Sequence, residues 1–277
     1  MSADLVSADE FFGRESSGGP GTESASQEAR PDVDLQVRWL GRVRFAEALK
    51  FQEELVASRR GDDSLGGELL LLEHEPVYTI GRTPDQASLR GATHLPHPVF
   101  PINRGGQATY HGPGQLMGYP IINLRRCGQD LHRYLRWLED LLMKLLADYE
   151  IAAQRREGLT GVWVENRKIA SIGVGVRHWI TMHGFALNVC GDLSPFDQIT
   201  PCGIANVTMT SMEKETGERC EVEKVARRVA HIARARFPDS LAERTRHASR
   251  VRFPKNSKRS TSDDITFSLV HGPPARR

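Results

Sequence analysis

The sequence predicts a single α+β domain, and three observations support this fold class. The chain has 277 residues, of which 39% are apolar, so it can bury a sizeable core without needing more than one domain. Short apolar runs typical of strands are interspersed with stretches whose apolar residues recur at helical spacing. The sequence contains no internal repeat. We therefore expect one globular unit built from both strands and helices.

The ordered unit is expected to run from 33 to 240, between two tails. Residues 1–32 are rich in Ser, Gly, Glu and Asp and cannot bury enough apolar surface to offset the entropy lost on ordering, which predicts a disordered N-terminal tail. Residues 241–277 carry more basic than acidic side chains and show no periodicity. Because no aromatic stacking platform accompanies this basic segment, we interpret it as a disordered, solvated tail without a nucleic-acid or membrane partner.

Composition and charge narrow the class of protein further. The formal net charge is +2, no window approaches about eighteen consecutive apolar residues, and the N-terminus lacks the basic and apolar regions of a signal peptide. A cytoplasmic protein is therefore expected. The cysteines form no C-x-x-C pair and have no closely spaced histidines, so neither a zinc site nor a disulfide framework is favoured. These cysteines are Cys127, Cys190, Cys202 and Cys220.

The first third of the chain predicts two strands and a helix. Alternation over 35–39 predicts a strand, and apolar residues at helical spacing predict a helix over 45–56. The continuous apolar run at 69–72 is typical of a buried strand. His74, just after this run, is interpreted as a structural histidine. Residues 84–101 contain four prolines and little periodicity, which predicts a loop.

The stretch at 104–123 reads R-G-G-Q-A-T-Y-H-G-P-G-Q-L-M-G-Y-P-I-I-N and is too rich in glycine and proline for a helix. One interpretation is a surface loop followed by a strand. The other is a binding loop, because Thr109, Tyr110 and His111 place a hydroxyl, a phenol and an imidazole between two glycine-rich corners. Glycine at these corners allows a backbone to lie directly against a ligand.

The second half of the chain predicts two more helices and at least three strands. Asp130 can cap a helix over 130–149 whose leucines share one face, and we interpret that helix as scaffold. Alternation on both sides of a polar corner predicts a β-hairpin over 161–176. A further strand is expected over 179–189, and apolar spacing predicts a helix over 213–236.

Two residues stand out for their chemistry. Pro201 and Gly203 bracket Cys202, which predicts a tight turn with the thiol at an exposed bend. A cysteine reacts as the thiolate, so a working thiol needs a nearby cation, base or helix N-terminus. Lys168 is the candidate cation because it lies in an otherwise apolar strand. The alternative is that Lys168 is a hairpin-edge lysine that points to solvent.

Several segments resemble the lipoyl(octanoyl) transferases, within the fold family of biotin and lipoate protein ligases. They are the R-G-G stretch, the decapeptide E-H-E-P-V-Y-T-I-G-R from Glu73 to Arg82, K-I-A-S-I-G, H-G-F-A-L-N and P-C-G. The resemblance covers about 69–212. Asn103 departs from it, because members often carry Asp before R-G-G. The resemblance implies a biotin/lipoate protein ligase-like α+β domain with a mixed or mainly antiparallel sheet packed against helices.

The resemblance also implies residue roles. Cys202 matches the nucleophile that forms an acyl thioester, and Lys168 matches the residue that lowers the pKa of this thiol or relays its proton. The positions that match acyl- and substrate-binding residues lie in three segments. They are Arg104, Gly105, Gly106, Gln107, Ala108, Thr109, Tyr110, His111, Ser171, Ile172, Gly173, Gly184, Phe185 and Ala186.

The reaction that the resemblance implies is transfer of an octanoyl group from octanoyl-acyl carrier protein to a lysine of lipoyl domains, without cofactor or metal. The acceptors would be lipoyl domains of 2-oxoacid dehydrogenases and the glycine cleavage H protein. One alternative is an ATP-dependent lipoate or biotin ligase, although Arg104 followed by neutral Gln107 is a poor phosphate clamp. Another is a catalytically silent scaffold that binds a carrier protein or nucleic acid through the basic tail.

Overall fold

The computed structural model describes residues 35–61, 66–82, 87–89 and 95–242. The predicted N-terminal tail lies outside this part of the chain. So does the predicted C-terminal tail, except its first two residues, which belong to the last helix. The disorder expected for the tails therefore stays a prediction.

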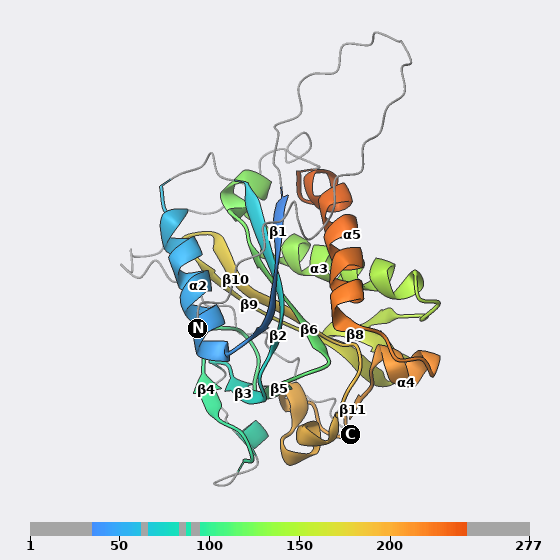
Figure 1. Ribbon diagram of the computed structural model, residues 1–277. Helices are drawn as coiled ribbons and strands as arrows, with labels where there is room; N and C mark the ends of the chain where they lie inside the picture. Colours follow the sequence, from blue (N-terminus) through green and yellow to red (C-terminus); the bar gives the residue numbers. More distant parts are fainter. Residues whose placement is uncertain (1–34, 62–65, 83–86, 90–94, 243–277) are drawn as a thin grey trace, which may run out of the picture.

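A mixed, mainly antiparallel sheet of eight strands forms the centre of the molecule, as expected (Figure 1). Seven strands follow the order β1-β2-β6-β10-β9-β8-β7, and β11 pairs with β9. Among the described strands of this sheet, only the β1–β2 and β11–β9 pairs are parallel. The strands are β1 Leu35–Val43, β2 Gly67–His74, β6 Gln115–Ile121, β7 Gln154–Arg156, β8 Leu159–Val164, β9 Arg167–Arg177, β10 Ile180–Asn188 and β11 Thr208–Met209.

Helices cover both faces of this sheet. In Figure 1, α2 lies on one side of the sheet, and α3 and α5 lie on the other. The buried leucines of β2 show why, since successive side chains of a strand point to opposite faces. Leu70 and Leu72 pack in the cluster that includes Ala48 of α2, whereas Leu69 and Leu71 pack with α3 and α5. The helices are α2 Phe45–Ser58, α3 Leu131–Ala147, α4 Met212–Thr216 and α5 Val222–Ala242.

The predicted helix over 130–149 is confirmed as α3, and Asp130 caps it. The Asp130 carboxylate accepts a hydrogen bond from the Arg133 backbone N–H at 3.0 Å. The helical character predicted over 213–236 is confirmed, but it is divided between two helices, α4 and α5. Gly217 ends α4 with a left-handed φ of 75°, and its N–H donates to the Glu213 carbonyl. A left-handed glycine of this kind ends a helix even where apolar residues continue at helical spacing after it.

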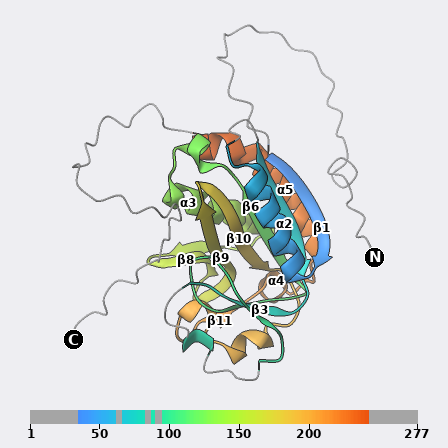
Figure 2. The ribbon, with the colours of Figure 1, turned by 90° about the vertical axis from the view of Figure 1, so that its left-hand side faces the viewer.

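A second sheet of three strands lies at one end of the molecule, near β11 (Figure 2). Its order is β4-β3-β5, with β3 at Val77–Ile80, β4 at Val99–Pro101 and β5 at Thr109–His111. The loop predicted over 84–101 is therefore partly wrong, because it contains β4 and a short 3₁₀ turn, η1, at Ala87–Leu89. A three-residue strand has too few positions to show a period, and pairing with β3 defines it.

None of the helices in the described part of the chain combines the length and the apolar character that crossing a membrane requires. Within that same part, no group of three or more His, Cys, Asp or Glu side chains is arranged to hold a metal ion.

Candidate active site

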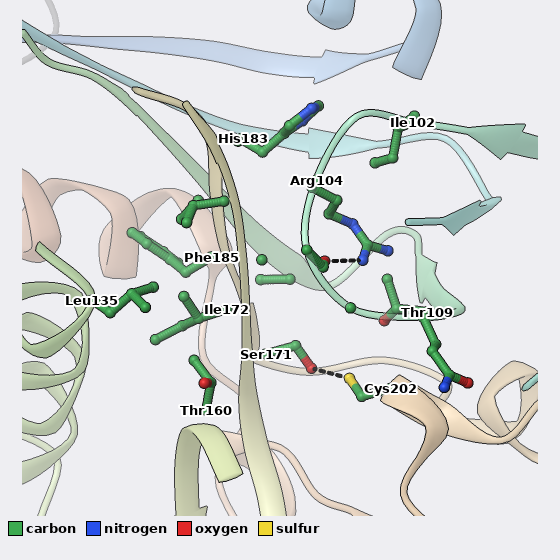
Figure 3. A pocket seen from close by; sticks show the side chains of 18 of the residues that line it. Ile102, Arg104, Thr109, Leu135, Thr160, Ser171, Ile172, His183, Phe185 and Cys202 are labelled. Carbon is green, nitrogen blue, oxygen red and sulfur yellow. Dashed lines mark hydrogen bonds between the residues drawn. The ribbon is translucent and has the colours of Figure 1, made fainter. Parts of the chain in front are cut away.

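A cavity of about 400 Å³ lies where the R-G-G loop meets β9 and β10 (Figure 3). This volume falls in the range of about 300–1,000 Å³ typical of small-molecule sites. The cavity reaches both faces of β9, since Ser171 lies on the side of Cys202 while Ile172 points toward Leu135 and Phe185 (Figure 3). It therefore joins a polar region near a thiol to an apolar region beside α3.

Cys202 lies in η4, a 3₁₀ turn at Pro201–Gly203, which confirms the predicted tight turn. Its φ of 56° is in the left-handed region, and its backbone N–H donates to the Ala108 carbonyl at 2.8 Å. The predicted exposed bend is wrong for the side chain. Cys202 is half-buried, and its sulfur faces the cavity at 3.7 Å from the Ser171 hydroxyl (Figure 3).

Lys168 does not point to solvent. Lys168 is 2% exposed, and it pairs with Trp163 across the β8–β9 ladder. The ammonium Nζ lies 3.4 Å from the Cys202 sulfur and 3.2 Å from the Thr160 carbonyl oxygen. It also lies 5.2 Å from the centre of the Trp163 ring, within the range of a cation–π contact. The two residues singled out in the sequence are therefore in direct contact.

The electrostatics of this contact favour a thiolate. Burial by itself would raise the pKa of Cys202. The positive charge of Lys168, the hydrogen bond from Ser171 and the charge of Arg104 act in the opposite direction and hold the pKa of Cys202 below its ordinary value. The site therefore favours the thiolate, which is the nucleophilic form of a cysteine.

Arg104 connects the R-G-G loop to the small sheet. The guanidinium is buried, and it donates to the Thr79 carbonyl and hydroxyl at 3.2 and 2.9 Å and to the Gly105 carbonyl at 2.9 Å. The loop lies directly on β9, where a Cβ at Gly173 would come within 2.9 Å of Arg104 Cδ. A Cβ at Gly175 would come within 2.6 Å of the Asn103 carbonyl oxygen. Glycine at these positions of β9 thus allows the loop to approach.

Three buried histidines near the cavity are uncharged. Burial lowers the pKa of His74 to about 4 and the pKa of His111 and His183 to about 3. His74 contacts the Val43 carbonyl and the Tyr119 hydroxyl at 2.8 and 2.7 Å, in keeping with its predicted structural character. None of the three provides the cation beside Cys202.

The sequence profile of the lipoyl protein ligase A/B catalytic domain matches residues 44–233. This chain belongs to that family.

Relatives within the family are closely similar. The octanoyltransferase of Geotalea uraniireducens (strain Rf4) is 53% identical over 191 residues, which are 69% of this chain and 87% of the relative. The octanoyltransferase of Geobacter sulfurreducens is 50% identical and covers 69% of this chain and 80% of the relative. The bipartite lipoate protein ligase from Thermoplasma acidophilum, solved in a study of that enzyme and its E2 lipoyl domain, shares the fold. Its TM-score is 0.59 at 14% identity, with 74% of this chain and 84% of that chain covered.

Most of the positions predicted as acyl- and substrate-binding residues line the cavity. They are Arg104, Gly105, Gly106, Gln107, Thr109, His111, Ser171, Ile172, Gly173, Gly184, Phe185 and Ala186. Ala108 and Tyr110 do not line it, and they pack instead in a separate cluster with Tyr78 and Phe196. The reason is strand geometry, since β5 points Thr109 and His111 to one face and Tyr110 to the other.

Sequence reasoning missed several lining residues. Thr160 precedes the predicted hairpin, and its carbonyl contacts Lys168. Leu131 and Leu135 belong to α3, whose leucine stripe predicts a purely structural helix, yet both line the cavity. They are half-buried, whereas Leu138 and Leu142 of the same stripe are fully buried. A leucine stripe alone does not reveal which of its members meets a cavity.

Proposed function

We propose that this chain transfers an octanoyl group from octanoyl-acyl carrier protein to the lysine amine of lipoyl domains through a thioester on Cys202. The observation that carries the proposal is the contact of 3.4 Å between the Lys168 ammonium and the Cys202 sulfur in the cavity. Close relatives named octanoyltransferase support the acyl group and the reaction class. The acceptors would be lipoyl domains of 2-oxoacid dehydrogenases and the glycine cleavage H protein.

The first step would be attack of the Cys202 thiolate on the carbonyl of the carrier thioester. A new C–S bond forms at Cys202, and the C–S bond to the carrier breaks. The departing thiolate of the carrier takes up a proton, for which the Lys168 ammonium is the nearest described donor. One thioester replaces another, so this step needs no nucleotide.

The second step would be attack of a neutral lysine amine on the acyl-enzyme. The C–N bond of the amide forms, the C–S bond to Cys202 breaks, and the attacking nitrogen would give its proton to Lys168, which is neutral after the first step. The Lys168 ammonium restored in this way would stabilise the departing Cys202 thiolate. The amide is more stable than the thioester it replaces, which supplies the driving force.

The surroundings of the thiol suit an acyl chain. Ile172, Phe185 and Leu135 form an apolar region of the cavity, which would favour a saturated chain over a charged one (Figure 3).

An ATP-dependent ligase is not favoured. Such an enzyme activates a free acid and needs groups that hold phosphate, but no cysteine. Here the guanidinium of Arg104 already donates to Thr79 and Gly105. A silent scaffold is disfavoured too, because Lys168 is buried without a carboxylate partner among the described residues. A buried ammonium is costly unless paired, and the Cys202 thiolate is the anion that this geometry offers.

We place the reaction in the cytoplasm, where thiols stay reduced.

The test of the proposed acyl transfer is the intact mass of the protein after incubation with octanoyl-acyl carrier protein. The mass should rise by one octanoyl group in the absence of ATP, and a lipoyl domain should then remove it. Cys202→Ala should show no adduct, and Cys220→Ala should match the unmodified sequence. Octanoylation of the lipoyl domain only with free octanoate and ATP would support the ligase instead.

A further inference from the structure

Glu139 of α3 is a buried carboxylate that does not line the cavity. The sequence places it off the leucine stripe, yet the residue is only 2% exposed. Its Oε2 accepts hydrogen bonds from Arg136 Nη1 at 2.6 Å and from Arg155 Nε at 2.8 Å. Its Oε1 accepts from the backbone N–H of Gly161 at 3.3 Å. One oxygen thus binds two guanidinium groups, and the other binds the main chain of β8.

The peptide unit between Thr160 and Gly161 connects this carboxylate to the site. Its N–H donates to Glu139, and its carbonyl accepts from Lys168 Nζ at 3.2 Å. A peptide unit is planar, and in the trans form its N–H and C=O point in opposite directions. Glu139 and Lys168 therefore bind opposite edges of one rigid plane. A negative charge at the N–H also polarises the carbonyl and makes it a better acceptor for an ammonium.

The position of this peptide unit strongly constrains the path of the Lys168 side chain. Gly161 has a φ of 125°, and a Cβ on it would come within 2.8 Å of Lys168 Cε and 2.6 Å of the Ala170 carbonyl oxygen. The stem of Lys168 therefore passes directly over the backbone of Gly161. A small tilt of the peptide plane would displace the ammonium relative to the Cys202 sulfur.

We propose that Glu139 is a positioning residue that holds the Thr160–Gly161 peptide unit so that its carbonyl anchors the Lys168 ammonium beside Cys202. This inference rests on the proposed function, because it assigns the Lys168–Cys202 contact a part in acyl transfer. Glu139 touches neither the sulfur nor the cavity. Its effect on the reaction is exerted through the main chain and Lys168.

The test compares Glu139→Gln with two control variants. Glu139→Gln keeps the shape of the side chain and removes its charge. Asp140→Asn removes the neighbouring charge, which pairs with the same Arg155 at 2.6 Å but does not contact Gly161. Glu68→Gln removes a carboxylate that is equally buried, at 2% exposure, and also binds two arginines, but lies on β2. The first control tests for a general charge effect, and the second tests for a general loss of stability.

The readouts are the pH dependence of iodoacetamide alkylation at Cys202, and kcat and KM for octanoyl-acyl carrier protein. In Glu139→Gln the alkylation midpoint should rise by about half to one pH unit, so that alkylation at pH 7 slows by about three- to tenfold. The value of kcat should fall by a similar factor, with KM unchanged. Asp140→Asn and Glu68→Gln should keep the alkylation profile of the unmodified sequence, even where Glu68→Gln melts earlier.

Two outcomes would overturn the proposal. One is an unchanged alkylation profile in Glu139→Gln, and the other is an equal shift in Asp140→Asn. If Glu139→Gln does not fold, Glu139→Asp replaces it, since the shorter carboxylate keeps its charge but withdraws from Gly161. A smaller upward shift is then expected, and no shift would refute the positioning. Alkylation requires no acyl donor, so a failure of octanoyl transfer in the unmodified sequence would refute the proposed function separately.

Discussion

Replacement of Lys168 by methionine tests the electrostatics of the site most directly. The substitution keeps an unbranched stem and removes the ammonium that lies 3.4 Å from the Cys202 sulfur. At that distance two unit charges interact by about 1 kcal/mol at the dielectric constant of water and about 5 kcal/mol at an effective dielectric constant of about 20. One pKa unit corresponds to about 1.4 kcal/mol. Because Cys202 is half-buried, Lys168→Met should raise its pKa by about one to three units.

Replacement of Lys168 by arginine distinguishes the effect of the positive charge from the effect of proton transfer. Lys168→Arg keeps a positive charge, so it should preserve much of the thiolate. A guanidinium stays protonated in proteins and cannot relay a proton. We therefore expect Lys168→Arg to form some acyl-enzyme but to pass the acyl group poorly to the acceptor lysine. Lys168→Met should be weak in both half-reactions.

The assay is the rate of iodoacetamide alkylation of Cys202 as a function of pH. Peptide mapping is needed because Cys127, Cys190 and Cys220 are also free thiols. Lys144→Met serves as the control, since Lys144 pairs with Asp148 on the surface of α3. The same alkylation midpoint in Lys168→Met and in the unmodified sequence would refute the thiolate–ammonium reasoning. Single-turnover acylation and transfer, measured in parallel, report the two steps separately.

Three further predictions concern the thiol, the loop and acid stability. Cys202→Ala should abolish acyl-enzyme formation and transfer, whereas Cys220→Ala should keep both; full turnover by Cys202→Ala would rule out the covalent route. Gly175→Ala should push the R-G-G loop away from β9, because the new Cβ would meet the Asn103 carbonyl oxygen at about 2.6 Å. The value of kcat/KM should therefore fall severalfold, with only a small decrease in Tm. His74 has its pKa lowered by burial to about 4, so the unfolded chain binds its proton more readily. Stability should therefore decrease as pH falls from about 6.5 toward 4, and a Tm that stays constant over this range would contradict the buried neutral imidazole.

The local pattern of apolar and capping residues was sufficient to predict most of the helices and strands. The apolar run at 69–72 predicts a buried strand, and β2 has buried leucines on both faces. The leucine spacing after Asp130 predicts α3 with its cap. Both predictions succeed because the period of apolar residues and the chemistry of a capping carboxylate act over a few residues. The small sheet could not be predicted this way, since β4 depends on pairing with the distant β3.

The sequence by itself determined the chemistry available to the site. The turn of Pro201 and Gly203 about Cys202 and the unusual lysine in an apolar strand are local features, and the family resemblance assigned them roles. Only the tertiary structure decided that the Lys168 ammonium lies 3.4 Å from a sulfur 34 positions away in the chain. The same holds for the neutral His111 and for the burial of Glu139. The physical reason is that the pKa of a group and the position of its partner depend on which distant segments exclude water and supply charge around it.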